Sequence, residues 1–159
     1  MSMTGNLLKI SKEKLAELQS DPSLVSKLVL SAIQEELEED DCLYLYKSWN
    51  ALHVLLNDGE PGAEADAVMG GTPIGEDQGY GPARLLNDQE VSEISAALAN
   101  ISKSDFESRF DVSKMTDVYS FHLEDAEDEW PIISDYFEEL KLFYASAAEQ
   151  SHGLLLYLV

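Results

Sequence analysis

The C-terminal part of the chain carries its strongest structural pattern. Apolar and aromatic side chains recur at helical spacing from 133 to 147, which predicts a long helix with one buried face. His152 and Gly153 end this pattern, and the apolar run 154–159 then predicts a strand that is buried on both faces. Such a strand must lie inside a sheet, and the helix before it needs a further layer to cover its apolar face.

The N-terminal part predicts one strand and three helices. Residues 5–10 are typical of a short strand, and Ser11 is a suitable cap for the helix that follows. A second helix begins at Asp21-Pro22, because proline is favoured in the first helical turn. A third helix is predicted from about 44 to 56 by apolar residues at helical spacing: Leu45, Trp49, Leu52 and Leu56.

Three more elements are predicted between this region and the C-terminal helix. A brief strand at 84–86 leads into a helix that opens with the capping box of Asn87 and Glu90. Ser104 begins another capping pattern and a short helix that ends near 110. Weak alternation at 118–123 indicates a further strand.

These patterns together predict an α+β fold. We expect a single domain over 1–159, with five or six helices packed with a small sheet that includes the N- and C-terminal strands. Repeats and a low-complexity linker are both missing from the sequence, which supports one domain rather than two.

The charge of the chain restricts its partners. Its 31 acidic and 10 basic residues give a formal net charge of -21, and the basic residues are scattered. Phosphate backbones and anionic lipid surfaces would be repelled, so we expect no nucleic acid and no membrane as partner. The acidic residues include two dense runs, 35–41 and 124–129. This balance favours a basic protein as partner. The alternative is that the acidity serves solubility or reflects a salty environment.

The sequence also predicts a cytoplasmic location. Its first residues have neither a basic start nor a long apolar stretch, so we expect no secretory signal. The single cysteine, Cys42, has no second cysteine for a disulfide, which fits a reducing compartment. The acidic run before Cys42 is expected to raise the pKa of its thiol, which disfavours a catalytic role.

Motifs of catalysis and metal binding are missing from the sequence. Neither a His-x-x-x-His, His-Glu-x-x-His or Cys-x-x-Cys spacing nor a calcium-binding loop pattern occurs. A Gly-x-Ser-x-Gly elbow and a phosphate-binding loop are missing as well. We therefore predict no metal and no cofactor, and we favour a non-catalytic protein over an enzyme.

A glycine-rich stretch from 59 to 82 is the most unusual part of the chain. It holds seven of the nine glycines and three of the five prolines, which predicts a long structured loop with a short helical turn at 63–69. The glycines permit either tight turns or a close approach of the backbone to a ligand. Both interpretations stay open from the sequence.

Arg84 follows this stretch directly and is one of two arginines in the chain. The rigid turn before it would aim its guanidinium, which could bind a carboxylate or phosphate with Tyr80 beside it. The alternative is an internal ion pair with Asp77 or another acidic residue that fastens the loop. Arg109, the second arginine, has Asp105 and Asp111 close in sequence and is interpreted as a partner in a helix-end ion pair.

Trp49 and His53 are four residues apart, so their rings should project from the same face of the predicted helix. A histidine there is either a hydrogen-bonded core residue or a base oriented by a carboxylate, with Asp58 or Asp77 as the first candidates. The candidate ligand-binding residues are therefore Trp49, His53, Asp77, Tyr80 and Arg84.

Several segments resemble a known family in the same order along the chain. Residues 49–56 match a Trp-x-x-Leu-His-x-Leu-Leu element, and Gly79-Tyr80-Gly81-Pro82-Ala83-Arg84 matches a central glycine-rich element. Arg109-Phe110-Asp111 and Phe143-Tyr144 continue the likeness. The chain thus resembles the bacterial YfbM-like family over nearly its whole length. Tyr46 and Ser120 depart from the family pattern. Because the family has no assigned function, the resemblance implies a fold but no reaction.

Two hypotheses for function follow. The first is a non-catalytic acidic protein that binds a basic partner, with an inhibitor or immunity-type role as one form. The alternative is a small-molecule-binding protein or enzyme whose site lies in the glycine-rich region 59–84.

Overall fold

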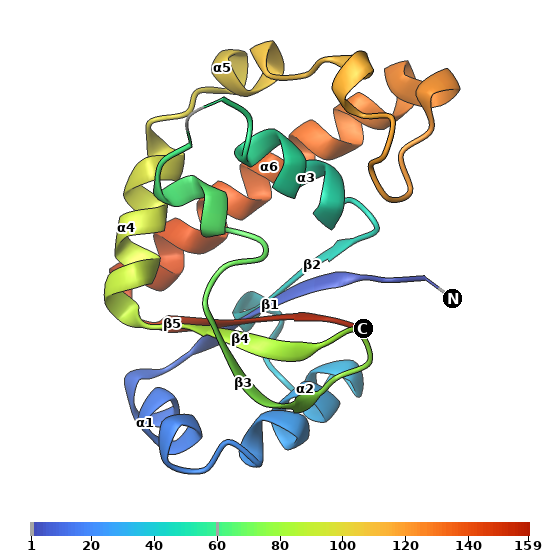
Figure 1. The fold of residues 1–159 in the computed structure, drawn as a ribbon. Coiled ribbons are helices and arrows are strands. Elements are labelled where there is room, and N and C mark those ends of the chain that lie inside the picture. The colour runs from blue at the N-terminus through green and yellow to red at the C-terminus, as the bar shows by residue number, and fades with distance from the viewer. Residues whose placement is uncertain (1, 60) are drawn as a thin grey trace.

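The computed structural model describes residues 2–59 and 61–159. Within these residues the chain forms six α-helices and one antiparallel sheet of five strands in the order β2-β1-β5-β4-β3 (Figure 1). The strands are β1 (Gly5–Ile10), β2 (Cys42–Tyr46), β3 (Thr72–Asp77), β4 (Pro82–Leu86) and β5 (Gly153–Leu158). The helices are α1 (Lys12–Ser20), α2 (Leu24–Ile33), α3 (Trp49–Leu56), α4 (Asp88–Ala99), α5 (Lys103–Ser108) and α6 (Ala126–Glu149). The predicted α+β fold is confirmed.

The strands nearest the two ends of the sequence, β1 and β5, lie side by side inside the sheet. Leu7 is opposite Leu156 in this antiparallel pair. Just outside the strands, Thr4 and Val159 exchange both backbone hydrogen bonds, with N···O distances of 2.7 and 3.1 Å. Because β5 also pairs with β4, it has a strand on each side. Its residues belong to the cores on both faces of the sheet, which explains its unbroken apolar sequence. The prediction that the terminal strands share one sheet is confirmed.

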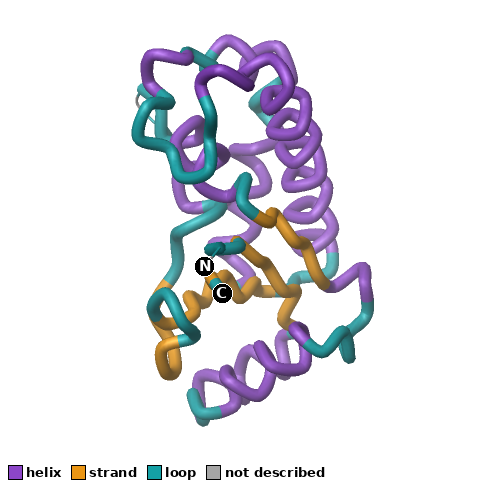
Figure 2. The backbone as a smooth tube through the Cα atoms, turned by 90° about the vertical axis from the view of Figure 1, so that its right-hand side faces the viewer, coloured by secondary structure: helices purple, strands orange, loops and turns teal. Residues whose placement is uncertain are grey.

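Helices cover both faces of the sheet (Figures 1 and 2). Helices α1 and α2 lie on one face, where they form a core with Leu8 and Leu155. Helices α3, α4 and α6 lie on the other face and form a larger core with Leu7 and Leu156. Since successive residues of a strand point to opposite faces, β1 and β5 supply side chains to both cores.

Local signals in the sequence explain where several helices begin. Ser11 caps α1, because its Oγ accepts a hydrogen bond from the backbone N–H of Lys14 at 3.2 Å. Asn87 and Glu90 form the predicted capping box at the start of α4. Among residues 2–59 and 61–159, no helix combines the length and the apolar composition that a bilayer span requires.

The predicted helix at 44–56 is wrong in its first part. Residues 42–46 form the strand β2, and α3 begins only at Trp49. Leu45 fits helical spacing because it is buried in the same core as Trp49, although it reaches that core from a strand. Tyr46 has a φ of 49°, so the backbone leaves the extended region there.

Two further predictions are corrected by the structure. Residues 118–122 form a turn and irregular backbone instead of a strand, and Leu123 begins the 3-10 turn η4 (Leu123–Asp125). Ser120 has a φ of 59°, which interrupts any alternation. Helix α5 is capped by Ser102 instead of Ser104. The Oγ of Ser102 accepts from the N–H of Asp105 at 3.0 Å, and the Asp105 carboxylate accepts from the N–H of Ser102 at 3.4 Å.

The glycine-rich stretch contains more structure than the sequence predicts. The short helical turn is confirmed as a 3-10 turn, η2 (Ala63–Asp66), and the brief strand at 84–86 is part of β4. The sequence does not predict β3, which pairs with β4 at the edge of the sheet. This strand contains Pro73 and Gly75 and is exposed at nearly every position, so it lacks the apolar alternation of a half-buried strand.

Candidate functional site

Trp49, the first of the predicted site residues, belongs to the core. Its side chain is buried, and its Nε1 donates to the backbone oxygen of Met3 at 3.2 Å. The ring packs beside Tyr119, with 6.0 Å between ring centroids. Gly5 lies directly beneath Trp49, since a Cβ at position 5 would be 2.3 Å from the Trp49 Cβ. Trp49 therefore joins α3 to the start of β1.

Asp77, Tyr80 and Arg84 lie on the hairpin of β3 and β4. The Oδ1 of Asp77 accepts from the backbone N–H groups of Gly79 and Gly81 at 2.6 and 3.2 Å, so this carboxylate closes the turn. Tyr80 is exposed, and the Nη1 of Arg84 donates to the backbone oxygen of Met69. Among the described residues, Arg84 and Asp77 form no ion pair. The hollow beside Tyr80 and Arg84 has a volume of about 20 Å³.

His53 is half-buried on α3, near the loop that Arg84 holds. Its Nδ1 lies 3.3 Å from the side-chain nitrogen of Asn57, which also donates to the backbone oxygens of His53 and Ala65. Burial lowers the pKa of His53 below its ordinary value of 6.5, and the positive charge of Arg84 lowers it further, against an opposing effect of Asp66. The structure thus places His53 and Arg84 within electrostatic range of each other.

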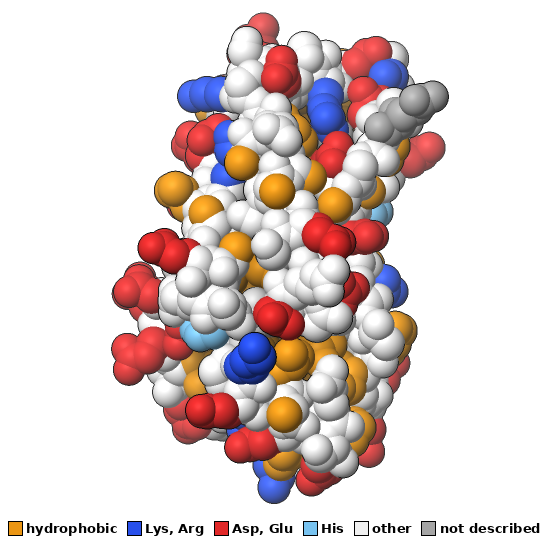
Figure 3. All heavy atoms as spheres, turned by 90° about the vertical axis from the view of Figure 1, so that its left-hand side faces the viewer, with side chains coloured by type: hydrophobic (Ala, Val, Ile, Leu, Met, Phe, Trp, Pro, Cys, Tyr) orange, Lys and Arg blue, Asp and Glu red, His pale blue; other side chains and the backbone are white. Residues whose placement is uncertain are grey.

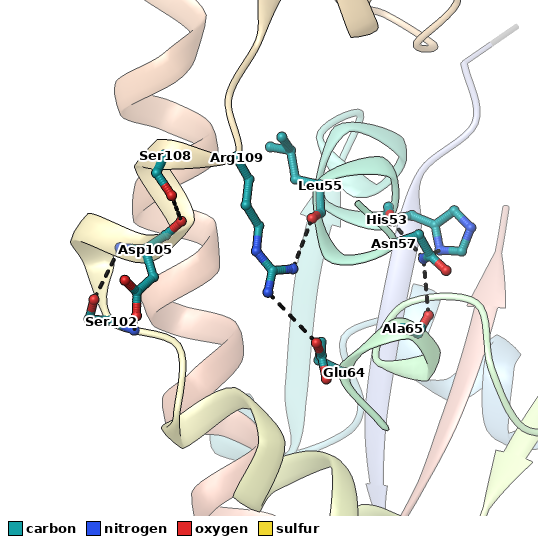
Figure 4. A network of polar contacts seen from close by, with 9 residues as sticks. All are labelled: His53, Leu55, Asn57, Glu64, Ala65, Ser102, Asp105, Ser108 and Arg109. Carbon is teal, nitrogen blue, oxygen red and sulfur yellow. Dashed lines mark hydrogen bonds and ion pairs between the residues drawn. The ribbon is translucent and has the colours of Figure 1, made fainter. Parts of the chain in front are cut away.

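Arg109 pairs with a residue that the sequence did not indicate. Its Nη2 lies 3.7 Å from Oε1 of Glu64, and its Nη1 donates to the backbone oxygen of Leu55 at 3.2 Å (Figure 4). Asp105 and Asp111 make local hydrogen bonds in their own turns instead. The guanidinium therefore connects the end of α5 to α3 and to η2, and the nearly buried Glu64 carboxylate is compensated.

A far larger hollow of the described surface lies elsewhere, between β2 and α6. We call it the β2–α6 groove; its volume is about 910 Å³. The 3-10 turn η1 (Glu39–Asp41) and β2 form one wall and α6 forms the other. The lining residues are Lys9, Glu38, Glu39, Asp40, Asp41, Cys42, Leu43, Tyr44, Tyr46, Tyr136, Glu139, Leu142, Phe143, Ser146 and Gln150.

A row of three tyrosines lies along this groove. The ring centroids of Tyr44 and Tyr46 are 6.3 Å apart, and those of Tyr46 and Tyr136 are 6.5 Å apart. Tyr46 is 57% exposed, and Leu142 on the opposite wall is 72% exposed. Large side chains of this kind are usually covered in a monomer, and a group of them with acidic neighbours is typical of an interaction site.

The groove is strongly acidic. Five carboxylates line it against one ammonium group, that of Lys9. The Lys9 Nζ donates to Ser146 Oγ at 2.8 Å and lies 5.2 Å from the centroid of the Phe143 ring, so this cation is already engaged by the protein. Acidic side chains also spread over the face seen in Figure 3. The groove thus combines carboxylates with aromatic and apolar side chains.

Cys42 and Tyr44, which line the groove, are held in their neutral forms by their surroundings. Burial raises the pKa of the Cys42 thiol and the charge of Asp41 raises it further, while a hydrogen bond with Tyr44 lowers it. The predicted direction of this shift is confirmed. Burial also raises the pKa of Tyr44 to about 12. Both groups are therefore neutral at pH 7, and neither is an activated nucleophile. Within the described part of the chain, no three His, Cys, Asp or Glu side chains form a group that could hold a metal ion.

The sequence contained a signal for this groove, although spacing arguments hid it. In Cys42-Leu43-Tyr44-Leu45-Tyr46, large side chains follow directly after the acidic run 35–41. In a strand, Tyr44 and Tyr46 are two residues apart, which is the spacing of side chains that share a surface. The contribution of α6 could not be found in this way, because it is almost a hundred residues away in sequence.

Comparison with known proteins supports the resemblance described above. The family model described as "Domain of unknown function (DUF1877)" matches residues 1–157. A search of the solved structures finds YfbM from Escherichia coli, a protein of unknown function, with a TM-score of 0.71 and 18% sequence identity over 98% of this chain and 99% of that chain. At this identity the likeness establishes a shared fold. No curated protein matches the chain. Because the family model spans almost the whole sequence, the chain belongs to the DUF1877 family of YfbM-like proteins.

Proposed function

We propose that this protein is a non-catalytic interaction protein, which binds a basic segment of a partner protein in the β2–α6 groove. The observation that carries this proposal is the composition of the groove, where five carboxylates stand beside exposed tyrosine and leucine side chains. Carboxylates attract Lys and Arg, and tyrosine rings take up their charged heads and apolar stems together. An inhibitor or immunity-type role is one in which this binding blocks the activity of the partner.

The charge of the whole molecule favours a basic partner over a second copy of the chain. Two copies with a net charge of -21 each would repel one another, most strongly where their acidic grooves met. The same field accelerates the approach of a basic protein, and it does so less as the ionic strength rises.

The alternative site in the region 59–84 receives less support from the geometry. The hollow beside Tyr80 and Arg84 has room for about one water molecule. Asp77 and Arg84 are also engaged by backbone groups of the loop. These contacts support a structural role for the residues that the sequence singled out on the hairpin.

Affinity capture with two matched charge-reversal variants tests the proposal. Glu38→Lys with Asp40→Lys reverses two carboxylates of the groove, whereas Glu124→Lys with Asp128→Lys reverses two exposed carboxylates of the other acidic run. We expect the native chain and the second variant to retain a stoichiometric basic protein from the native lysate at about 0.15 M salt. The groove variant should lose it.

Equal retention by both variants would contradict the assignment of the groove. If the native chain retains no basic protein above low salt, the acidity serves solvation and the proposed function is wrong. The inhibitor role is checked separately, by measuring whether the retained partner loses its own activity when the protein is added.

A further inference from the structure

We propose that the partner segment binds as an extended strand added to the outer edge of β2, with Lys or Arg at alternate positions directed toward α6. This inference rests on the proposed function and specifies how the groove would be occupied. It is supported by the hydrogen-bonding phase of β2, by the contrast between the two edges of the sheet and by the dimensions of the groove.

The alternation of hydrogen bonds along β1 shows which backbone groups of β2 face outward. Thr4 and Val159 exchange both of their backbone hydrogen bonds, so even-numbered residues of β1 bond to β5. Odd-numbered residues of β1 then bond to β2, and Leu7 bonds with Leu43, which lies opposite it. The N–H and C=O groups of Tyr44 therefore point away from β1, toward the open edge.

The outer edge of β2 has no other strand beside it among the described residues. At Cys42, the N–H is already used by the backbone oxygen of Glu39, while its C=O shares the outward direction of the Tyr44 groups. Three main-chain groups are thus free to pair with a partner strand: the N–H and C=O of Tyr44 and the C=O of Cys42. The two residues are two positions apart, which is the spacing of hydrogen-bonding residues along one edge of an antiparallel strand.

The two edges of the sheet differ in how they are protected. The edge strand β3 carries Pro73, Gly75, Glu76 and Asp77, and its register with β4 is irregular, all of which hinder pairing with another chain. The edge strand β2 has neither charge nor proline nor glycine in Cys42-Leu43-Tyr44-Leu45-Tyr46. Its register with β1 is also irregular, but the bulge lies at the C-terminal end, between Tyr44 and Tyr46. The β2 edge is therefore open to strand addition where the β3 edge is blocked.

The groove has the length and chemistry for such a strand. Its α6 wall extends from Tyr136 to Gln150, about 21 Å at 1.5 Å per residue, and β2 itself spans about 17 Å. Five or so extended residues would fit. In an added strand, alternate side chains point to the same side, so one set would face Tyr136 and Glu139 on α6.

A synthetic peptide of alternating Lys and Val, six residues long and blocked at both ends, is the probe. Its matched control has the same sequence but carries N-methyl groups on alternate amides, which removes the hydrogen bonds of one edge without changing charge. The two readouts are the dissociation constants of both peptides at about 0.1 M salt and the hydrogen exchange of the Tyr44 amide, followed by NMR.

We expect the unmodified peptide to bind at least about tenfold more tightly than the N-methylated one, and to slow exchange at Tyr44. Glu139→Gln should weaken binding, whereas Glu107→Gln, an exposed acid outside the groove, should not. Equal binding of both peptides with unchanged exchange at Tyr44 would overturn strand addition while leaving a basic-segment groove intact. If neither peptide binds, or if Glu107→Gln weakens binding as much as Glu139→Gln, the groove itself is wrongly assigned.

Discussion

The two arginines of the chain both hold the glycine-rich region against the body of the domain. Arg84 donates to the backbone oxygen of Met69, and Arg109 reaches Glu64 in the η2 turn. A guanidinium suits this task because it offers several donors in a fixed plane and keeps its charge when partly buried. The sequence indicated that Arg84 follows a rigid turn, but it could not show that the acceptor would be a main-chain carbonyl.

His53 reports on the position of Arg84. We expect the His53 ring to titrate below the ordinary pKa of 6.5, because burial and then the Arg84 charge disfavour its protonated form. Replacing Arg84 with Met should raise the pKa of His53, whereas Lys103→Met, which removes an exposed charge on α5, should leave it nearly unchanged. NMR titration of the histidine ring measures both effects. Equal shifts in the two variants would show that Arg84 acts only through net charge.

The same shift has a consequence for stability. Because the pKa of His53 is lower in the folded state, the unfolded chain binds its proton first as the pH falls through about 6.5. His53 therefore lowers stability progressively as the pH falls from that value to its folded pKa. The loss stays constant below this range and is absent above it. Replacing His53 with Gln should remove this part of the pH dependence of the free energy of unfolding, measured by urea denaturation. The comparison with the native chain separates the contribution of His53 from that of the carboxylates.

At the scale of single elements, the N-terminus of α5 shows how capping decides where a helix starts. The sequence pattern predicts Ser104 as the cap, with Glu107 at the third helical position. The structure forms the capping box with Ser102 and Asp105. Ser102→Ala should therefore cost about 1 kcal/mol of stability, measured by urea denaturation, because an N–H of the first turn loses its acceptor.

Ser104→Ala is the matched control, and alanine at this helical position should be neutral or slightly stabilising. A larger loss in Ser104→Ala than in Ser102→Ala would place the cap at the position that the sequence favoured. Such a result would also move the start of α5 along the chain.

The elements that sequence patterns predict well carry a signal in their own residues, which is an apolar run, helical spacing or a cap. The strands β1 and β5, the helices α2, α4 and α6 and the turn η2 all follow from spacing and caps. The strands β2 and β3 are edge strands, so neighbours on one side are missing and apolar alternation is weak. Residues 118–123 include the buried side chains of Val118 and Phe121, although the backbone there is not a strand. Alternation of apolar residues alone cannot distinguish this arrangement from a strand.

The candidate site could be predicted only in part for the same reason. Residues chosen for rarity or spacing, such as Trp49 and Arg84, proved to be held by the protein itself. The β2–α6 groove depends on the packing of two segments distant in sequence. The acidic run 35–41 is evident in the sequence. The tyrosines that line the groove beside it follow only from the strand conformation of residues 42–46.

For the whole molecule, net charge is the dominant electrostatic feature. The described residues form three ion pairs, which are too few to offset the repulsion of 31 acidic residues. Raising NaCl from about 10 to about 100 mM shortens the Debye length from about 30 to about 10 Å and should therefore stabilise the fold. Urea denaturation measures this, because urea adds no charge of its own.

The groove variant with Glu38→Lys and Asp40→Lys provides the control for this effect. It is less negative by four charges, so its midpoint of unfolding should rise less with salt than that of the native chain. If salt lowers the midpoint in both proteins, attractive ion pairs contribute more than overall repulsion. Attraction within ion pairs would then affect stability more than repulsion among the acidic side chains.

The position of β5 has a consequence for how the chain is made. On the ribosome, β1 with β2 and β3 with β4 emerge as two separate pairs, and β5, the last strand to emerge, must enter between β1 and β4. Until then, each pair presents a bare inner edge with apolar side chains on both faces. A nascent chain stalled before residue 153 would therefore expose two strand pairs whose unpaired edges can bind other chains. We expect such a chain to depend on chaperones more than the folded protein does.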